Sequence, residues 1–168
     1  MANVAMDHFS PTTENPLDVV EQVVSLRELA CERPAQDELL AEIEGSWCSY
    51  RLWFSWQPDL QGMMLISAFD LKIPKAARTQ VQELLCLINE RIWLGHFDMS
   101  SEDGGISFRH GVLMKGMGAV SESQMSELVD IAFEECERFY PAFQSVIWGG
   151  QKPEDAMKFA MFETFGEA

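Results

Sequence analysis

The clearest pattern in the chain is an alternation of apolar and polar side chains that predicts a central β-hairpin. Over residues 47–57 large apolar side chains recur at every second position, and the alternation returns over residues 63–69. Successive side chains of a strand point to opposite faces, so each segment is typical of a strand with one buried face. Residues 58–62 between them contain proline, aspartate and glycine, which favour a turn. If Trp56 pairs with Met63, apolar residues meet along the whole hairpin and the register is self-consistent.

The other elements follow from the spacing of apolar residues and from helix boundary signals. Asn15 followed by Pro16 suits the start of a helix, and Ser121 suits the N-cap of another. Pro141 lies inside the last long helical pattern, where we expect it to kink or restart the helix. In chain order the patterns predict a helix over 16–30, a strand over 37–43, the central hairpin, a helix over 74–95, a second hairpin over 96–114, and helices over 121–148 and 153–164.

The order α-β-β-β-α-β-β-α-α predicts an α+β fold, in which helices pack on an antiparallel sheet of about five strands. The first fourteen residues are polar and show no periodicity. We therefore expect residues 1–14 to form a flexible N-terminal tail ahead of a single domain over residues 15–168. A chain of 168 residues can bury a substantial core without disulfide or metal cross-links.

Charge and cysteine usage exclude several classes of function. The chain has 12 basic and 27 acidic residues, a formal net charge of -15. This charge repels phosphates and anionic lipids, so we expect neither nucleic-acid nor membrane partners. No segment has the composition of a signal peptide or a membrane span. The cysteines show no metal-ligand spacing, and we expect them to be buried thiols of a cytoplasmic protein without a cofactor: Cys31, Cys48, Cys86 and Cys136.

Two histidines are the first candidate for chemistry. A hairpin centred on Asp103 would bring His96 opposite His110, close enough to share a metal ion or to sense pH. A shift of one residue in the turn would instead place them on opposite faces. The more common interpretation is one buried, hydrogen-bonded histidine and one at the sheet edge. A cysteine nucleophile with a distant histidine is a weaker alternative, because no nucleophile elbow or glycine-flanked cysteine supports it.

Acidic residues form a stripe along one side of the long helix expected after Ser121. They recur at spacings of three and four residues, which places them on one helix face: Glu127, Asp130, Glu134 and Glu137. Such a stripe can be a solvated surface that keeps the protein soluble. It can also attract a basic or amphipathic segment of a partner. Both interpretations remain open from the sequence.

The second face of the central hairpin is more apolar than a solvated face needs to be. We expect Trp53, Met64 and Ile66 to lie together on it, with Leu113 nearby. A half-apolar sheet face is typically buried against another surface. That surface could belong to a second subunit or to a client peptide, or the C-terminal helix could fold over the face.

Four segments of the chain, in this order and spacing, resemble the YbjN family of bacterial sensory transduction regulators. They are WCSYRLWF at 47–54, LINERIWLGHF at 87–97, ERFYPAF at 137–143 and IWGG at 147–150. The resemblance runs from about Asn15 to Gly166. It implies a fold like that of type III secretion chaperones, which are small, acidic, often dimeric proteins that bind partner proteins without catalysis. It implies no catalytic residues.

The sequence thus favours a non-enzymatic, cytoplasmic, protein-binding regulator or chaperone-like protein that forms a homodimer. The apolar sheet face would bury partner or subunit surface, and the acidic helix would favour basic segments. The alternative is a sensor of a small ligand or metal that uses His96 and His110. An enzyme with a reactive thiol is the third hypothesis.

Overall fold

The computed structural model describes residues 15–116 and 119–163, so the tail expected over residues 1–14 lies outside the described residues. Six strands form one sheet in the order β1-β2-β3-β4-β6-β5, and all neighbouring strands are antiparallel. The elements in chain order are α1 (Pro16–Leu26), β1 (Ala30–Ala35), β2 (Glu38–Glu44), β3 (Ser49–Gln57), β4 (Gly62–Lys72), the short 3-10 helix η1 (Lys75–Ala77), α2 (Arg78–Asn89), β5 (His96–Met99), β6 (Gly105–Leu113), α3 (Glu122–Ile147) and α4 (Pro153–Glu163). The predicted α+β class is confirmed.

The central hairpin forms in the predicted register. Trp56 pairs with Met63, and Tyr50 at the other end of β3 pairs with Phe69. The alternation therefore gives the sheet two distinct faces. The inner face carries the buried residues of each strand, such as Leu52, Phe54 and Leu65. The outer face carries the residues that alternate with them and that remain exposed or half-buried.

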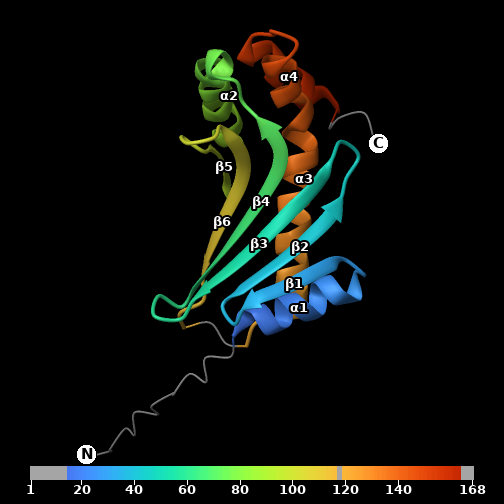
Figure 1. The fold of residues 1–168 in the computed structure, drawn as a ribbon, viewed down its shortest axis with the longest axis vertical. Helices are drawn as coiled ribbons and strands as arrows, with labels where there is room; N and C mark the ends of the chain where they lie inside the picture. Colours follow the sequence, from blue (N-terminus) through green and yellow to red (C-terminus); the bar gives the residue numbers. More distant parts are fainter. Residues whose placement is uncertain (1–14, 117–118, 164–168) are drawn as a thin grey trace, which may run out of the picture.

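The helices lie on the inner side of the sheet. The long helix α3 runs along the strands, α1 packs on β1–β3 and α3, and α2 and α4 pack together at the far end (Figure 1). A cluster of aromatic rings joins the layers, because the ring of Phe97 in β5 lies 5.4 Å from that of Phe108 and 5.8 Å from that of Phe139 on α3. Edge-to-face ring pairs of this kind add to the free energy of area burial. Among the described residues, no helix is long and apolar enough to cross a bilayer.

The sequence analysis missed β1, because the first helix ends earlier than expected. Glu28 adopts a left-handed conformation with φ 56°. Its N–H donates to the Ser25 carbonyl, and the N–H of Leu29 donates to the Val24 carbonyl. This is the Schellman arrangement, which usually requires glycine at the left-handed position. With glutamate there, no glycine marks the stop, and the mostly exposed side chains of β1 give no alternation.

Two further expectations about helices differ from the structure. The helix expected over 74–95 starts as η1 and ends at Asn89, before Gly95. Helix α3 continues through Pro141 rather than restarting there. Proline removes one hydrogen bond from the helix, but Phe139 and Phe143 on either side of it are fully buried. We attribute the continuity of α3 to this packing.

The side chain of Asn89, at the end of α2, forms hydrogen bonds with backbone groups on the unpaired side of the edge strand β5. Its Nδ2 donates to the Phe97 carbonyl oxygen over 3.0 Å, and its Oδ1 accepts from the Phe97 N–H over 2.8 Å. Unpaired backbone groups at a sheet edge can recruit another strand. The Asn89 amide occupies both groups at the buried Phe97, so this position of the edge is blocked.

We expect Asn89→Ala to lower the free energy of unfolding by about 1–2 kcal/mol, because two part-buried hydrogen bonds are lost. It should also accelerate amide hydrogen exchange at Phe97. Urea denaturation and exchange measured by NMR test both effects. Glu90→Ala at the neighbouring exposed position is the control. Equal stability of the two variants would contradict the role assigned to Asn89.

Candidate functional site

An apolar row crosses the outer face of the sheet. Leu40 of β2 pairs with Trp53 of β3, and Trp53 pairs with Ile66 of β4. Trp53 is 40% exposed and Leu40 is 38% exposed, while Ile66 is half-buried. The row continues across the sheet to Arg109 of β6 and His96 of β5.

Met64 and Leu113 extend this apolar surface along the strands. Met64 pairs with Gly111, and Leu113, which is 60% exposed, pairs with Gly62. The structure thus places all four residues predicted for this surface on one face. We call Leu40, Trp53, Met64, Ile66 and Leu113 the outer apolar surface. Leu40 was missed, although its position among glutamates on the polar side of the β2 alternation could have signalled it.

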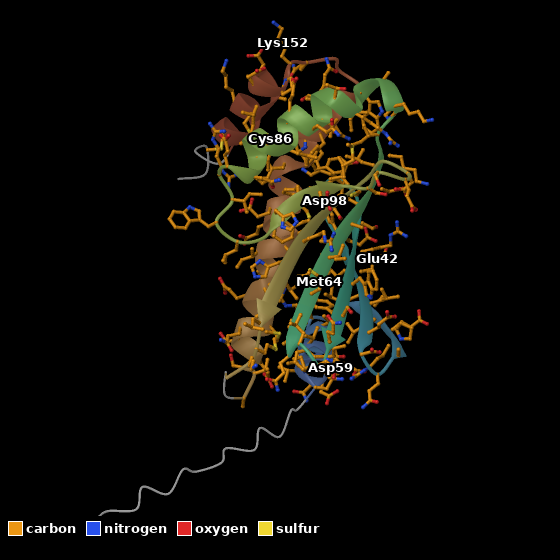
Figure 2. All side chains as sticks on the ribbon, turned by 90° about the vertical axis from the view of Figure 1, so that its left-hand side faces the viewer. Glu42, Asp59, Met64, Cys86, Asp98 and Lys152 are labelled. Atoms are coloured by element: carbon orange, nitrogen blue, oxygen red, sulfur yellow. The ribbon has the colours of Figure 1, made fainter. Side chains whose placement is uncertain are left out.

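The C-terminal helix packs elsewhere. The described part of α4 contacts α3 and α2 at the far end of the molecule. Figure 2 views the outer face, and Met64 lies on the strands there with no helix in front of it. The suggested covering of this face by the C-terminal helix is therefore absent from the described residues.

Charged residues of both signs border the outer apolar surface. Glu42 of β2 pairs with Arg51 of β3, and Arg109 of β6 forms an ion pair with Asp98 over 3.3 Å. The acidic residues are concentrated at β2, where three glutamates alternate with Leu40 on the outer face: Glu38, Glu42 and Glu44. A partner that covers Leu40 and Trp53 must also approach this acidic margin.

The acidic stripe of α3 is divided by its contacts within the chain. Asp130 receives hydrogen bonds over 2.6 and 2.7 Å from the two terminal nitrogens of Arg27. Glu137 accepts from Tyr50 Oη over 2.6 Å. The remaining two, Glu127 and Glu134, are exposed. Because α3 lies on the inner side of the sheet, the stripe and the outer apolar surface face different directions and cannot form one continuous site.

Glu137 fastens α3 to the turn between β2 and β3. Its two carboxylate oxygens also accept from the backbone N–H of Ser46 over 3.1 and 3.0 Å. Burial opposes ionisation of this carboxyl, but the hydrogen bonds outweigh it, so the pKa of Glu137 lies below its ordinary value. Burial and the bond to Glu137 raise the pKa of Tyr50. A Cβ at Gly45 would collide with the side chains of Glu137 and Tyr50, which explains the glycine in this turn.

The two candidate histidines lie on opposite faces of the sheet. His96 pairs with Arg109 rather than with His110, and His110 pairs with the buried Leu65 on the inner face. This is the one-residue shift that separates the side chains. Within residues 15–116 and 119–163, no three histidine, cysteine, aspartate or glutamate side chains are grouped so that they could hold a metal ion. The geometry of the described residues therefore does not support a metal sensor that uses His96 and His110.

The thiols offer little support for a cysteine nucleophile. Burial raises the pKa of Cys136 to about 12, and its Sγ lies 3.4 Å from Ser67 Oγ. Burial also raises the pKa of Cys48. A catalytic thiol needs the opposite shift. Cys31 and Cys86 are exposed, so the expectation that all four cysteines are buried is wrong. The pattern around Cys86 is helical, but its side chain lies on the solvent side of α2.

Comparisons with known proteins identify relatives in family and fold. A family model described as "YbjN: Putative bacterial sensory transduction regulator" matches residues 16–145. The crystal structure of YbjN from E. coli is similar with a TM-score of 0.52 and 12% sequence identity, over 72% of this chain and 85% of that chain. A chain in the crystal structure of the ExsC-ExsE complex has a TM-score of 0.46 and 8% identity, over 72% of this chain and 90% of that chain. No curated protein matches the sequence significantly.

We expect Glu137→Gln to lower the free energy of unfolding at neutral pH by about 1.5–3 kcal/mol, because charge-assisted hydrogen bonds are lost. The folded-state pKa of Glu137 is depressed below 4.5. Its stabilising contribution is therefore complete above the ordinary carboxyl range and disappears as the pH falls through the folded-state pKa. The difference between wild type and variant should shrink below about pH 4.5.

Urea denaturation of both proteins at neutral pH and at about pH 3 measures this difference. Glu134→Gln changes the same functional group on the exposed side of the same helix and is the matched control. A deficit in Glu137→Gln that stays constant over the whole pH range would contradict the assignment.

Proposed function

Because the chain belongs to the YbjN family, we propose that it is a non-enzymatic, chaperone-like regulator that binds a partner protein through the outer apolar surface. The observation that carries this proposal is the row formed by the exposed Leu40 and Trp53 and the half-buried Ile66 on a sheet face that no described helix covers. Exposed apolar patches of this kind mark interaction sites in soluble proteins.

The size of the face supports a modest interface. Four central strands spaced about 4.8 Å apart and about nine residues long offer roughly 600 Å² on one partner. Counted on both partners, this is close to the lower limit of about 1,200 Å² for specific, stable complexes. Trp53 lies in the middle of the row, where a tryptophan contributes most to binding. The face therefore suits reversible binding of a polypeptide segment.

The charge of the chain indicates what kind of partner segment the outer apolar surface would bind. The net charge of the chain is -15, and the acidic margin of β2 lies directly beside Leu40. An amphipathic segment with apolar residues on one side and lysine or arginine on the other matches both features. We therefore take the occupant of the outer apolar surface to be a basic, amphipathic segment of a partner protein.

A cytoplasmic location and the absence of catalysis belong to the same proposal. Two exposed thiols, Cys31 and Cys86, suit a reducing compartment, where they remain unpaired. The raised pKa values of Cys48 and Cys136 disfavour nucleophilic catalysis by these two thiols.

A homodimer would use the same surface, and we propose that it forms when charge is screened. Two copies that each carry a net charge of -15 repel each other. Salt shortens the range of this repulsion to about 3 Å at 1 M but leaves apolar contacts in place. Self-association should then compete with binding of the basic partner.

We expect Trp53→Glu to weaken binding of a basic amphipathic peptide about 10- to 30-fold, as for other tryptophan hot spots. A fluorescein-labelled peptide of alternating leucine and lysine is the probe, and fluorescence polarisation measures its affinity. The added carboxylate would by itself attract this peptide, so a loss of affinity reports the lost apolar contact. A peptide of alternating leucine and glutamate should not bind.

Trp93→Glu makes the same change at a side chain that is 97% exposed in the segment between α2 and β5, and it should leave the affinity unchanged. Urea denaturation of both variants confirms that they fold. If wild type and Trp53→Glu bind the peptide with equal affinity, the outer apolar surface is not the binding site.

Light scattering behind a sizing column tests the dimer. We expect the mass to be 19.1 kDa in low salt and to rise toward twice that value in about 0.5 M salt. The Trp53→Glu variant should stay monomeric at both salt concentrations. A monomer at every salt and protein concentration would contradict the homodimer, and a stable dimer in low salt would contradict the electrostatic argument.

A further inference from the structure

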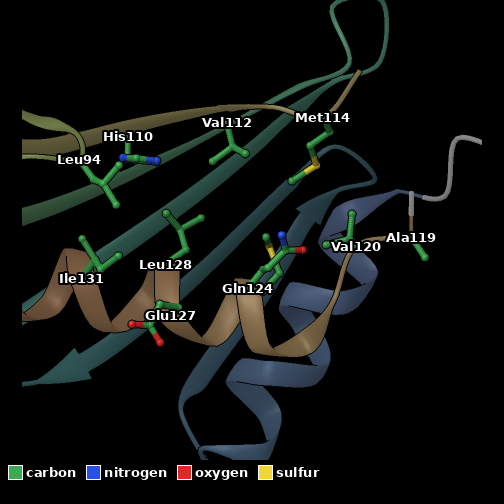
Figure 3. Close-up of a pocket in the computed structure, with 11 residues that line it drawn as sticks. Leu94, His110, Val112, Met114, Ala119, Val120, Gln124, Glu127, Leu128 and Ile131 are labelled. Atoms are coloured by element: carbon green, nitrogen blue, oxygen red, sulfur yellow. The ribbon is translucent and has the colours of Figure 1, made fainter. Parts of the chain in front are cut away.

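An apolar cavity of about 230 Å³ lies between β6 and the first half of α3, on the inner side of the sheet. Figure 3 shows His110 and Val112 of β6 facing Leu128 and Ile131 of α3 across it. Leu128 is buried, whereas Glu127 at the same level of the helix is exposed. The cavity thus has an apolar interior and a mouth at the protein surface.

His110 contributes a buried polar atom to this cavity, which the exposed Gln124 and Glu127 also line. Its Nδ1 is inaccessible to solvent and has no hydrogen-bond partner among the described residues. A buried polar group without a partner destabilises the folded protein, and such groups in native structures often mark a bound molecule or water. Burial lowers the pKa of His110, with a smaller effect from His96, so the ring is uncharged at neutral pH.

Volume and charge define what could occupy the cavity. An apolar cavity of about 150 Å³ can hold benzene, and pockets for drug-sized ligands begin at about 300 Å³. The 230 Å³ here suits a molecule somewhat larger than benzene. An uncharged imidazole gives a carboxylate no counter-ion, and the exposed Glu127 at the mouth repels anions. A hydroxyl group can both donate and accept, so it pairs with Nδ1 in either tautomer of the ring.

We propose that this cavity binds a small, uncharged amphiphile, an aliphatic chain of about six carbons with one hydroxyl group hydrogen-bonded to Nδ1 of His110. The chain lies between Val112 and Leu128, and the hydroxyl replaces the missing partner of the histidine. This site is separate from the outer apolar surface, because His110 and Arg109 point to opposite faces of β6. The proposal therefore does not rest on protein binding.

NMR titration of the full chain with 1-hexanol tests the proposal. We expect saturable shifts of the methyl signals of Val112, Leu128 and Ile131, together with a change in the Nδ1 shift of His110. For a ligand this small the dissociation constant should be of the order of 1 mM. Hexanoate should bind at least 10-fold more weakly, because the site offers it no positive charge.

Two kinds of variant separate a bound ligand from a nonspecific solvent effect. His110→Phe keeps an aromatic ring but removes the hydrogen bond, and should weaken 1-hexanol about 5- to 10-fold. His96→Phe, the same change on the outer face, should leave the affinity unchanged. Leu128→Trp should fill the cavity and abolish binding, and Ile131→Phe serves the same purpose if Leu128→Trp does not fold.

The proposal fails if 1-hexanol causes no saturable shifts in these methyl groups. It also fails if hexanoate and 1-hexanol bind equally well, or if His110→Phe and His96→Phe bind 1-hexanol with the same affinity.

Discussion

The structure depends on the one-sided burial of its antiparallel sheet. Helices α1, α2 and α3 pack against the inner side of the sheet and α4 packs on α2 and α3, while the ring of Phe97 connects β5 with β6 and with α3. An antiparallel sheet tolerates this arrangement because one of its faces can remain in contact with water. The outer face must then be polar or serve as an interaction surface. In this chain it is acidic along β2 except at Leu40 and apolar across Trp53 and Ile66, and that combination defines the candidate binding surface.

The acidic residues of α3 show how tertiary contacts redistribute a simple sequence pattern. Four carboxylates share one side of the helix, but Asp130 binds Arg27 of the segment after α1, and Glu137 binds Tyr50 and Ser46. These contacts tie α3 to the segment before β1 and to the turn between β2 and β3, and of the four carboxylates only Glu127 and Glu134 are exposed. Two of the four carboxylates, Asp130 and Glu137, therefore bind other parts of the chain and stabilise the fold. The acidity next to the outer apolar surface comes from β2, at the other side of the molecule.

Strand β6 connects the two sites that this structure suggests. Its residues alternate between the outer face, where Arg109 and Gly111 border Ile66 and Met64, and the inner face, where His110 and Val112 line the cavity. Strand β6 therefore contributes residues to both sites, and the two sites lie on opposite faces of the sheet.

The sequence by itself determined the α+β class, the central hairpin and its register, and the membership of Trp53, Met64, Ile66 and Leu113 in one face. These features follow from local periodicity, because a period of two fixes which side chains share a face. Only the tertiary structure decided that Glu28 ends α1 in a left-handed conformation, that β5 pairs one residue out of the register needed to join His96 and His110, and that Arg27 meets Asp130. Each depends on contacts between residues distant in the chain or on a backbone state that the residue type does not favour. The cavity beside His110 arises in the same way, from the space that two separately folded elements leave between them.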